Sequence, residues 1–330
     1  MQWQEGCRFI VLHFSCNIVK VQPKIFKVFD FFFNLKLKSP YKEFTKSMDI
    51  LKTTPQMQQW AKIKKKEAKT ICLVPTMGYL HQGHISLVKK GKLLCDELVI
   101  SIFVNPVQFG LNEDLGTYPS NIEKDLDLAR KAGVTAVFLP KKESVYPENF
   151  QTRIELPPLS QFLCGKTRPV HFSGVAIIIT KLFNIIMPDI AIFGQKDYQQ
   201  LQIIRQLVCD LDFDIKIISG DIIRENDGLA MSSRNAYLSK AQRVSALSLS
   251  KSLNLAKEMI DKRESNPEII KTKMKAFINS FSETQIEYIN FCNPKTLEDL
   301  SIIKSKTLLA VAVKVGDTRL IDNAIINPAS

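Results

Sequence analysis

Short apolar runs alternate with longer helix-like segments between residues 70 and 220, and this rhythm constrains the fold more than any other feature. Parallel strands need crossover connections, usually helices, so the alternation predicts an α/β fold built on a doubly wound (Rossmann-like) parallel sheet. Ligands of such sheets bind outside the carboxyl ends of the strands. The predicted strands lie at 70–76, 97–104, 135–140, 189–194 and 214–220, and the predicted helices at 84–95, 120–133, 174–188 and 197–211.

Capping signals mark the ends of three predicted helices. In the segment 120–133, Ser120 and Glu123 match a capping box and Gly133 is a typical C-terminal stop. Two later helices begin with similar signals: Ser239 with Gln242 for residues 238–260, and Asn266 with Pro267 for residues 266–279.

The alternation stops after residue 222. Beyond the two later helices, residues 286–293 and 307–326 have the pattern of antiparallel strands joined by turns. The sequence therefore predicts three parts: an N-terminal extension outside the functional fold (1–47), a Rossmann-like domain (48–222) and a smaller α+β lid domain (223–330).

Composition narrows the class of protein. The seven cysteines are scattered without a CxxC pair, which argues against a zinc site or a disulfide framework and favours a reducing, cytoplasmic location. No apolar run reaches the roughly 18 residues of a membrane span, so no membrane partner is expected. The net charge of +12 suits an anionic small substrate as well as RNA, but no arginine-rich stretch is interleaved with aromatics, so no nucleic acid is expected.

Two of the chain's four histidines lie in one turn, VPTMGYLHQGHISLV, where a predicted strand passes into a helix. Backbone N–H groups at a helix start attract phosphate, and Gly78 and Gly83 allow the backbone to approach a ligand. His81 and His84, three residues apart, would face the same side and donate hydrogen bonds to phosphate oxygens. Metal binding is less favoured, because no third ligand lies nearby in the sequence.

Three further segments place polar residues at strand ends or between the two domains. Asn105 and Gln108 in SIFVNPVQFG could bind hydroxyls and carboxylates, although this segment taken alone favours a polar turn fixed by Pro106. FGQKDYQQ offers Lys196 for phosphate and Asp197 as a helix cap or a magnesium or ribose partner. RENDGLAMSSRN ends in a hydroxyl-rich, cationic loop that suits a polyphosphate.

Taken together and in order, these motifs resemble the pantothenate synthetase (pantoate–β-alanine ligase) family, over residues 48–327. The resemblance rests on PTMGYLHQGH, IFVNPVQF, YPSNIEKDL, RPVHFSGV, PDIAIFGQKDYQQL and RENDGLAMSSRNAYLS. It implies a homodimeric enzyme of the HxGH nucleotidyltransferase superfamily that uses ATP and Mg²⁺. Pantoate would attack the α-phosphate of ATP to give pantoyl adenylate and pyrophosphate, and β-alanine would then displace AMP to give pantothenate.

The resemblance also implies residue roles. His84, assisted by His81, would stabilise the leaving pyrophosphate, and Lys196 would contact phosphate. Gln108 and Gln200 would bind pantoate, with Gln108 also bordering β-alanine, and Asp125 would help place magnesium. Arg168 and His171 would border the site. The implied ATP-binding residues are Met77, Gly78, Tyr79, Leu80, His81, Gln82, Gly83, His84, Gly194, Gln195, Lys196, Asp197, Ile223, Met231, Ser232, Ser233 and Arg234.

The sequence departs from the family pattern at Gln195, where the family usually has Glu, and in its long N-terminal extension. Two other functions stay open at this point. A nucleotidyltransferase that moves a nucleotide onto a phosphorylated acceptor would need extra cations where this chain has Gln108 and Gln200. A non-catalytic RNA-binding module would need a concentrated basic face.

Overall fold

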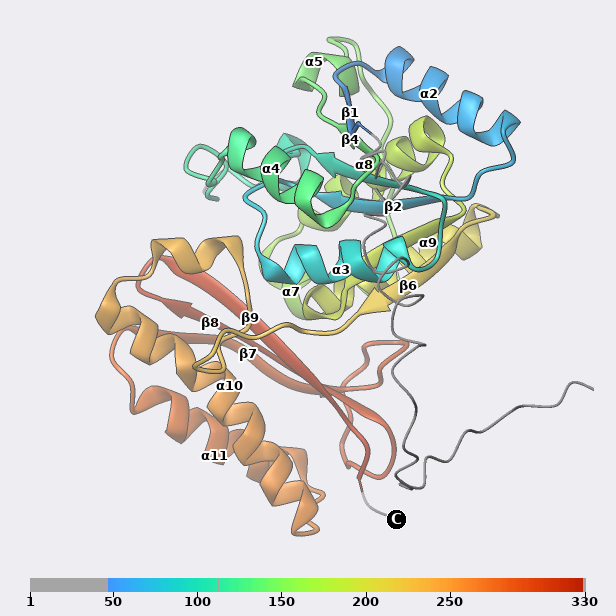
Figure 1. The fold of residues 1–330 in the computed structure, drawn as a ribbon. Coiled ribbons are helices and arrows are strands. Elements are labelled where there is room, and N and C mark those ends of the chain that lie inside the picture. Colours follow the sequence, from blue (N-terminus) through green and yellow to red (C-terminus); the bar gives the residue numbers. More distant parts are fainter. Residues whose placement is uncertain (1–46, 112, 329–330) are drawn as a thin grey trace, which may run out of the picture. The chain divides into compact units, whose positions relative to one another are not determined.

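The computed structural model describes residues 47–111 and 113–328, and its larger sheet is parallel throughout (Figure 1). Neighbouring strands in this six-stranded sheet follow the order β1-β4-β3-β2-β5-β6. The predicted strands are confirmed, whereas β1 was not anticipated. The bounds are β1 (Asp49–Leu51), β2 (Ile71–Thr76), β3 (Glu97–Ile102), β4 (Ala136–Phe138), β5 (Ile190–Gly194) and β6 (Lys216–Gly220).

Helices cover both faces of this sheet, as a doubly wound fold requires (Figure 1). Strand β2 shows the two faces in its own residues: Ile71 and Leu73 belong to one buried apolar cluster, and Cys72 and Val74 to another. The first cluster packs under α2 (Thr54–Lys66), α8 (His171–Ile186) and α9 (Tyr198–Asp210), and the second under α3 (Gln82–Lys92) and α4 (Ile122–Ala132). A strand apolar on both faces is typical of a buried parallel sheet.

The capping predictions are confirmed with one exception. Asn121, not Ser120, is the N-cap of α4, where its side chain accepts a hydrogen bond from Lys124 N at 3.1 Å. Asparagine caps as well as serine does, and the helix begins one residue later than predicted. Gly133 ends α4 in the left-handed conformation, with φ of 84°, as expected.

The C-terminal part forms a separate antiparallel sheet with two helices, as predicted. Strands β7 (Thr284–Cys292), β8 (Thr307–Val315) and β9 (Thr318–Ile326) pair in sequence order. Helices α10 (Lys240–Asp261) and α11 (Pro267–Asn279) share a buried apolar cluster with this sheet. Both helices carry the predicted N-caps, Ser239 and Asn266.

Short helices fill the connections between these elements. They are α5 (Lys142–Val145), α6 (Pro157–Ser160) and α7 (Leu163–Thr167), and the 3₁₀ turns η1 (Pro106–Gln108), η2 (Gln195–Asp197) and η3 (Ser233–Tyr237). The predicted boundary between residues 222 and 223 falls just after β6 and stays a prediction. The predicted extension, apart from Ser47, lies outside the described residues. None of the helices in the described part is long and apolar enough to cross a membrane.

Candidate active site

The strand order reverses between β2 and β5, and the two loops that leave these strands lie at this switch point. In doubly wound sheets this is where ligands bind. Two adjoining cavities of about 770 and 230 Å³ open there. The residues that line both cavities come from the predicted motifs: Arg168, His171, Lys196, Asp197, Gln200, Ser232 and Arg234.

The two histidines are fixed by the start of α3. His81 is the N-cap, and its Nδ1 accepts a hydrogen bond from Gly83 N at 3.1 Å. His84 Nδ1 accepts in turn from His81 N at 3.3 Å, which completes a capping box made of two imidazoles. The ring centroids are 4.0 Å apart. Both side chains line the smaller cavity, so the structure brings the predicted pair together at the switch point.

Both imidazoles are neutral near pH 7. Burial lowers the pKa of His81 to about 4, and the charge of Lys196 contributes to this shift. Burial also lowers the pKa of His84 well below its usual value, helped by His81 and Lys196. Because each Nδ1 accepts a hydrogen bond, the single proton of each neutral ring lies on Nε2. The pair therefore provides two uncharged N–H donors that need no ionisation to act.

A third histidine shares this property, which leads to a prediction about stability. Burial lowers the pKa of His171 to about 4, and its Nδ1–H donates to Gln108 O at 3.0 Å. Below pH 6.5 the unfolded chain protonates these three histidines while the folded chain does not. Stability should therefore fall as pH drops from about 6.5 towards 4, by up to ~1.4 kcal/mol per pH unit for each histidine.

Urea unfolding at pH 6.5 and 5.0 measures this dependence. The variant His171→Asn removes one of the three groups, so its free energy of unfolding should change less between the two pH values. Equal pH dependence in the parent and the variant would show that His171 is not held neutral.

Asp125 anchors the turn that precedes the histidines. Its two carboxylate oxygens accept from Tyr79 N at 2.8 Å and from Leu80 N at 2.6 Å, and its side chain is buried. Gly78 lies directly beside this carboxylate with φ of +90°, a conformation that suits glycine. Burial raises the pKa of Asp125, although the two N–H donors oppose the shift. The contacts of Asp125 are therefore those of a residue that fixes the shape of the turn between β2 and α3.

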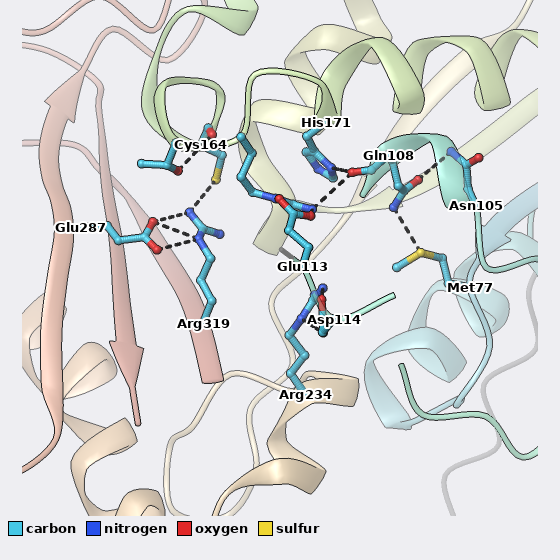
Figure 2. A network of polar contacts seen from close by, with 12 residues as sticks. Met77, Asn105, Gln108, Glu113, Asp114, Cys164, His171, Arg234, Glu287 and Arg319 are labelled. Carbon is cyan, nitrogen blue, oxygen red and sulfur yellow. Dashed lines mark hydrogen bonds and ion pairs between the residues drawn. The ribbon is translucent and has the colours of Figure 1, made fainter. Parts of the chain in front are cut away.

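Gln108 lies in a polar network at the end of β3 (Figure 2). Its Oε1 accepts from Asn105 Nδ2 at 3.0 Å, and its Nε2 approaches Met77 Sδ at 3.1 Å. Tyr146, which sequence reasoning missed, donates its hydroxyl to Asn105 Oδ1 at 2.9 Å. Met77, Asn105 and Gln108 all line the smaller cavity. The predicted amides therefore have fixed orientations at the site.

The loop after β5 contributes a cation. Lys196 lines both cavities and makes no ion pair with any residue that the structure describes. Gly194 lines the smaller cavity, and a Cβ placed on it would meet nothing within 4 Å, so the backbone there is open to a ligand. Asp197 and Gln200 line both cavities as well.

The loop Met231–Arg234 packs against the turn that precedes α3. Ser233 donates from its hydroxyl to Tyr79 O at 3.3 Å, and Met231 Cβ lies 3.6 Å from the position that a Cβ on Gly83 would occupy. Met231 N also donates to Ile223 O at 2.9 Å, and both residues line the smaller cavity. The predicted loop residues therefore lie beside the histidine turn.

Two acidic residues that sequence reasoning missed pair with the arginines of the site, and Figure 2 labels the pair Asp114–Arg234. Asp114 accepts from Arg234 Nε and Nη2, both at 2.8 Å. Glu113 accepts from Arg168 Nε at 2.7 Å and from Nη2 at 2.5 Å. Burial alone would raise the pKa of both carboxyls, but the arginines lower it below its usual value. Nothing in the local sequence around Glu113 and Asp114 indicates these long-range pairs.

Some predicted residues line neither cavity. Leu80 is buried in the apolar cluster under α3, and Gln82 is exposed on the first turn of that helix. Gln195 contributes its backbone carbonyl, which accepts a hydrogen bond, and its side chain is absent from both cavity linings. The replacement of the family's usual Glu by Gln195 therefore changes no cavity-lining side chain. Gly78 and Tyr79 contribute through the shape of the loop.

A doubly wound sheet with neutral histidine donors, a cavity-lining lysine and a hydroxyl-rich loop at its switch point defines a nucleotide-binding α/β enzyme. The family model of pantoate–β-alanine ligase matches residues 49–325. The chain belongs to this family, and it is accordingly an enzyme that ligates pantoate and β-alanine at the expense of ATP.

Relatives and solved structures agree with this assignment. The chain is 55% identical to the pantothenate synthetase of Desulforapulum autotrophicum over 85% of this chain and 99% of that protein. It is 50% identical to that of Caldicellulosiruptor bescii, over 84% and 99%. The structure of pantothenate synthetase from Thermus thermophilus matches with a TM-score of 0.81 at 37% identity, over 85% and 100%. The ligase of Francisella tularensis, complexed with beta-gamma ATP and beta-alanine, matches with a TM-score of 0.69 at 32% identity, over 86% and 100%.

Proposed function

We propose that the two cavities at the switch point carry out both steps of the ligation. In the first step a pantoate carboxylate oxygen attacks the α-phosphorus of ATP, and the bond from that phosphorus to the bridging oxygen breaks to release pyrophosphate. In the second step the β-alanine amine attacks the acyl carbon of pantoyl adenylate, and AMP leaves with the former carboxylate oxygen. The observation that carries the proposal is the pair of neutral histidine donors in the same cavity as Lys196 and Gln108.

The histidines and Lys196 act on the phosphates. Negative charge builds on the pyrophosphate oxygens as the first bond breaks, and preorganised donors stabilise that charge best. His84 Nε2–H donates to the leaving pyrophosphate, with His81 beside it. Lys196 supplies the positive charge that two neutral rings lack. The other ATP contacts come from the open backbone at Gly194 and from the loop Met231–Arg234.

The smaller cavity suits a compact hydroxy acid. Gln108 and Gln200 are among its polar lining residues, and neutral amides bind hydroxyl and carboxylate groups without imposing a charge. Its apolar wall is formed by Val175, Ile178, Ile179, Leu182 and Phe193. We assign this cavity to pantoate, whose hydroxyls and carboxylate contact the amides while its methyl groups contact the wall. Gln108 then borders the position of the incoming amine.

In this proposal Mg²⁺ binds to the enzyme together with the ATP phosphates. The described residues contain no group of three or more acidic, cysteine or histidine side chains that could hold a metal ion. Each oxygen of Asp125 accepts one backbone hydrogen bond, and its expected part in placing magnesium stays a prediction. Mg²⁺ commonly binds through substrate phosphates and waters, with few protein ligands. No catalytic step is therefore assigned to a protein-bound metal.

A single assay tests the function. The protein is incubated with ATP, pantoate and β-alanine, and AMP and pantothenate are measured with each acid omitted in turn. We expect stoichiometric AMP and pantothenate only when both acids are present. AMP release that does not depend on β-alanine, or no AMP at all, would contradict the proposal. Transfer of the nucleotide to a phosphorylated acceptor would favour the nucleotidyltransferase alternative instead.

The N-terminal extension should be dispensable for this chemistry. A chain that begins at Met48 retains every residue assigned to the two cavities, and the family model begins at residue 49. We expect its kcat and KM values to equal those of the full chain. A loss of activity or of solubility on truncation would show that the extension contributes to the enzyme. Homodimer formation and a cytoplasmic location stay predictions, which sizing by light scattering and imaging of a tagged chain would test.

A further inference from the structure

Two consecutive residues of β9, Asp322 and Asn323, contact the segment that leads to the Met231–Arg234 loop and the Lys196 loop, respectively, from the C-terminal sheet. Asn323 Nδ2 donates to Gln195 O at 3.1 Å and to Lys196 O at 2.8 Å, both in the loop after β5. Asp322 forms a two-point ion pair with Arg224, at 2.7 and 3.1 Å, at the start of the segment that leads to Ser232. Both side chains are buried, with 3% of each residue exposed. Neither residue belongs to a motif that sequence analysis singled out.

The orientation of the Asn323 amide is fixed by its partners. Two backbone carbonyls can only accept, so the NH₂ group must face them and Oδ1 must point away. Oδ1 is buried and has no hydrogen-bond partner among the described residues. The polar contacts of this side chain are therefore those with the Lys196 loop, and burial of an unsatisfied oxygen is a cost that these contacts offset.

Asp322 restrains the Met231–Arg234 loop indirectly, through the short hairpin of residues 224–230 that precedes it. Arg224 forms a β-bridge with Ala230, and its guanidinium also donates to Gly228 O at 3.1 Å. The hairpin continues directly into Met231 and Ser232. Asp322 Oδ1 additionally accepts from Asn323 N at 2.8 Å, which links the two restraints to each other.

We propose that Asp322 and Asn323 are positioning residues for adenylate formation: together they set the Lys196 loop and the Met231–Arg234 loop at a fixed separation. Asn323 acts through Lys196, and Asp322 acts through Arg224. The inference rests on the proposed contact of Lys196 with the ATP phosphates. It assigns to the C-terminal sheet a direct part in arranging the nucleotide site. A misplacement of about 1 Å is enough to cost ~10²-fold in rate.

A double-mutant cycle tests the coupling of Asn323 to Lys196. Pantoate-dependent exchange of pyrophosphate into ATP is measured for Asn323→Ala, for Lys196→Ala and for the double variant. We expect Asn323→Ala to lower kcat for exchange by ~10- to 100-fold, and to add less than twofold in the Lys196→Ala background. The second half-reaction, from supplied pantoyl adenylate and β-alanine, should change much less, because no bond to pyrophosphate breaks in it.

Two further variants separate positioning from stability. Asn290→Ala makes the same substitution in the same sheet, where the side chain contacts Asp299 and neither loop, and its exchange rate should equal the parent's. Asn323→Asp keeps the shape but places an acceptor against two carbonyls, so its exchange rate should be at least as low as that of Asn323→Ala. Thermal unfolding of each variant checks that it is folded.

The outcomes distinguish the positioning role of Asn323 from the proposed role of Lys196 at the ATP phosphates. Full exchange activity in Asn323→Ala beside an impaired Lys196→Ala would overturn the positioning role alone. Equal fold-losses from Asn323→Ala in both backgrounds would also overturn it, because the residue would not act through Lys196. Full activity in Lys196→Ala would overturn the proposed role of Lys196 and this inference with it.

Discussion

Replacement of His84 by alanine is expected to lower the rate of adenylate formation by at least ~10²-fold, the scale for the loss of one transition-state donor. The imidazole is neutral and its Nε2–H is the group that alanine removes. Pantoate-dependent exchange of pyrophosphate into ATP measures this step without the second half-reaction. Because the effect is on the transition state, kcat should fall while the KM for pantoate changes little.

Two matched variants sharpen this experiment. Lys89→Ala alters an exposed residue of the same helix that lines neither cavity, and it should leave the exchange rate unchanged. His84→Gln keeps an uncharged N–H donor of similar reach, so it should be about tenfold more active than His84→Ala if the donor must be neutral. Near-normal exchange in a folded His84→Ala protein would remove His84 from its assigned role.

Replacement of Gly83 by alanine is expected to have an effect of similar size on the exchange rate with only a small loss of stability. A Cβ at this position would lie 2.9 Å from both Cε1 and Nδ1 of His81, so the ring must leave its place at the start of α3. Alanine in a helix is more favourable than glycine by ~0.5–1 kcal/mol, which offsets part of the strain. We expect an exchange rate lower by ~10²-fold, because the His81 donor is displaced from its place beside His84.

Gly116→Ala is the matched control for this change. A Cβ on Gly116 would meet nothing within 4 Å, so activity and thermal stability should both equal the parent's. The melting temperatures and exchange rates of the two variants together show whether Gly83→Ala acts on the position of His81 or on the stability of the protein. If Gly83→Ala keeps more than a third of the exchange rate, the tight contact with His81 does not control catalysis.

Local patterns in the sequence predicted most of the fold. Strands and helices of the doubly wound sheet have strong periodicity and clear end signals, so they could be identified from single segments. Strand β1 was missed because its three residues are too few to show any periodicity. The start of α4 was misplaced because Ser120 and Asn121 are both good N-caps, and only the three-dimensional structure shows which one accepts the hydrogen bond.

Some parts of the site could be predicted from a contiguous stretch of sequence, whereas others depend on contacts between residues far apart in the chain. The histidine turn and the serine–arginine loop are contiguous, so their composition indicates a phosphate site directly. The pairs Asp114–Arg234 and Asn323–Lys196 join residues 120 and 127 positions apart, and no local pattern reports such contacts. The expectation that Asp125 helps to place magnesium stays a prediction, whereas its hydrogen bonds with the backbone N–H groups of Tyr79 and Leu80, 45 to 46 residues away, were not foreseen.

Strand β2 pairs with β3 on one edge and β5 on the other, and both of its faces are buried. The strand that delivers the two imidazoles thus has no free side on which to accommodate a change of shape. We therefore expect a substitution in either apolar layer to shift the histidine turn, so that stability and turnover change together along this strand. New specificity in this enzyme would have to arise from the loops at the rim or from the α8 side chains that line the smaller cavity, while strand β2 stays as it is.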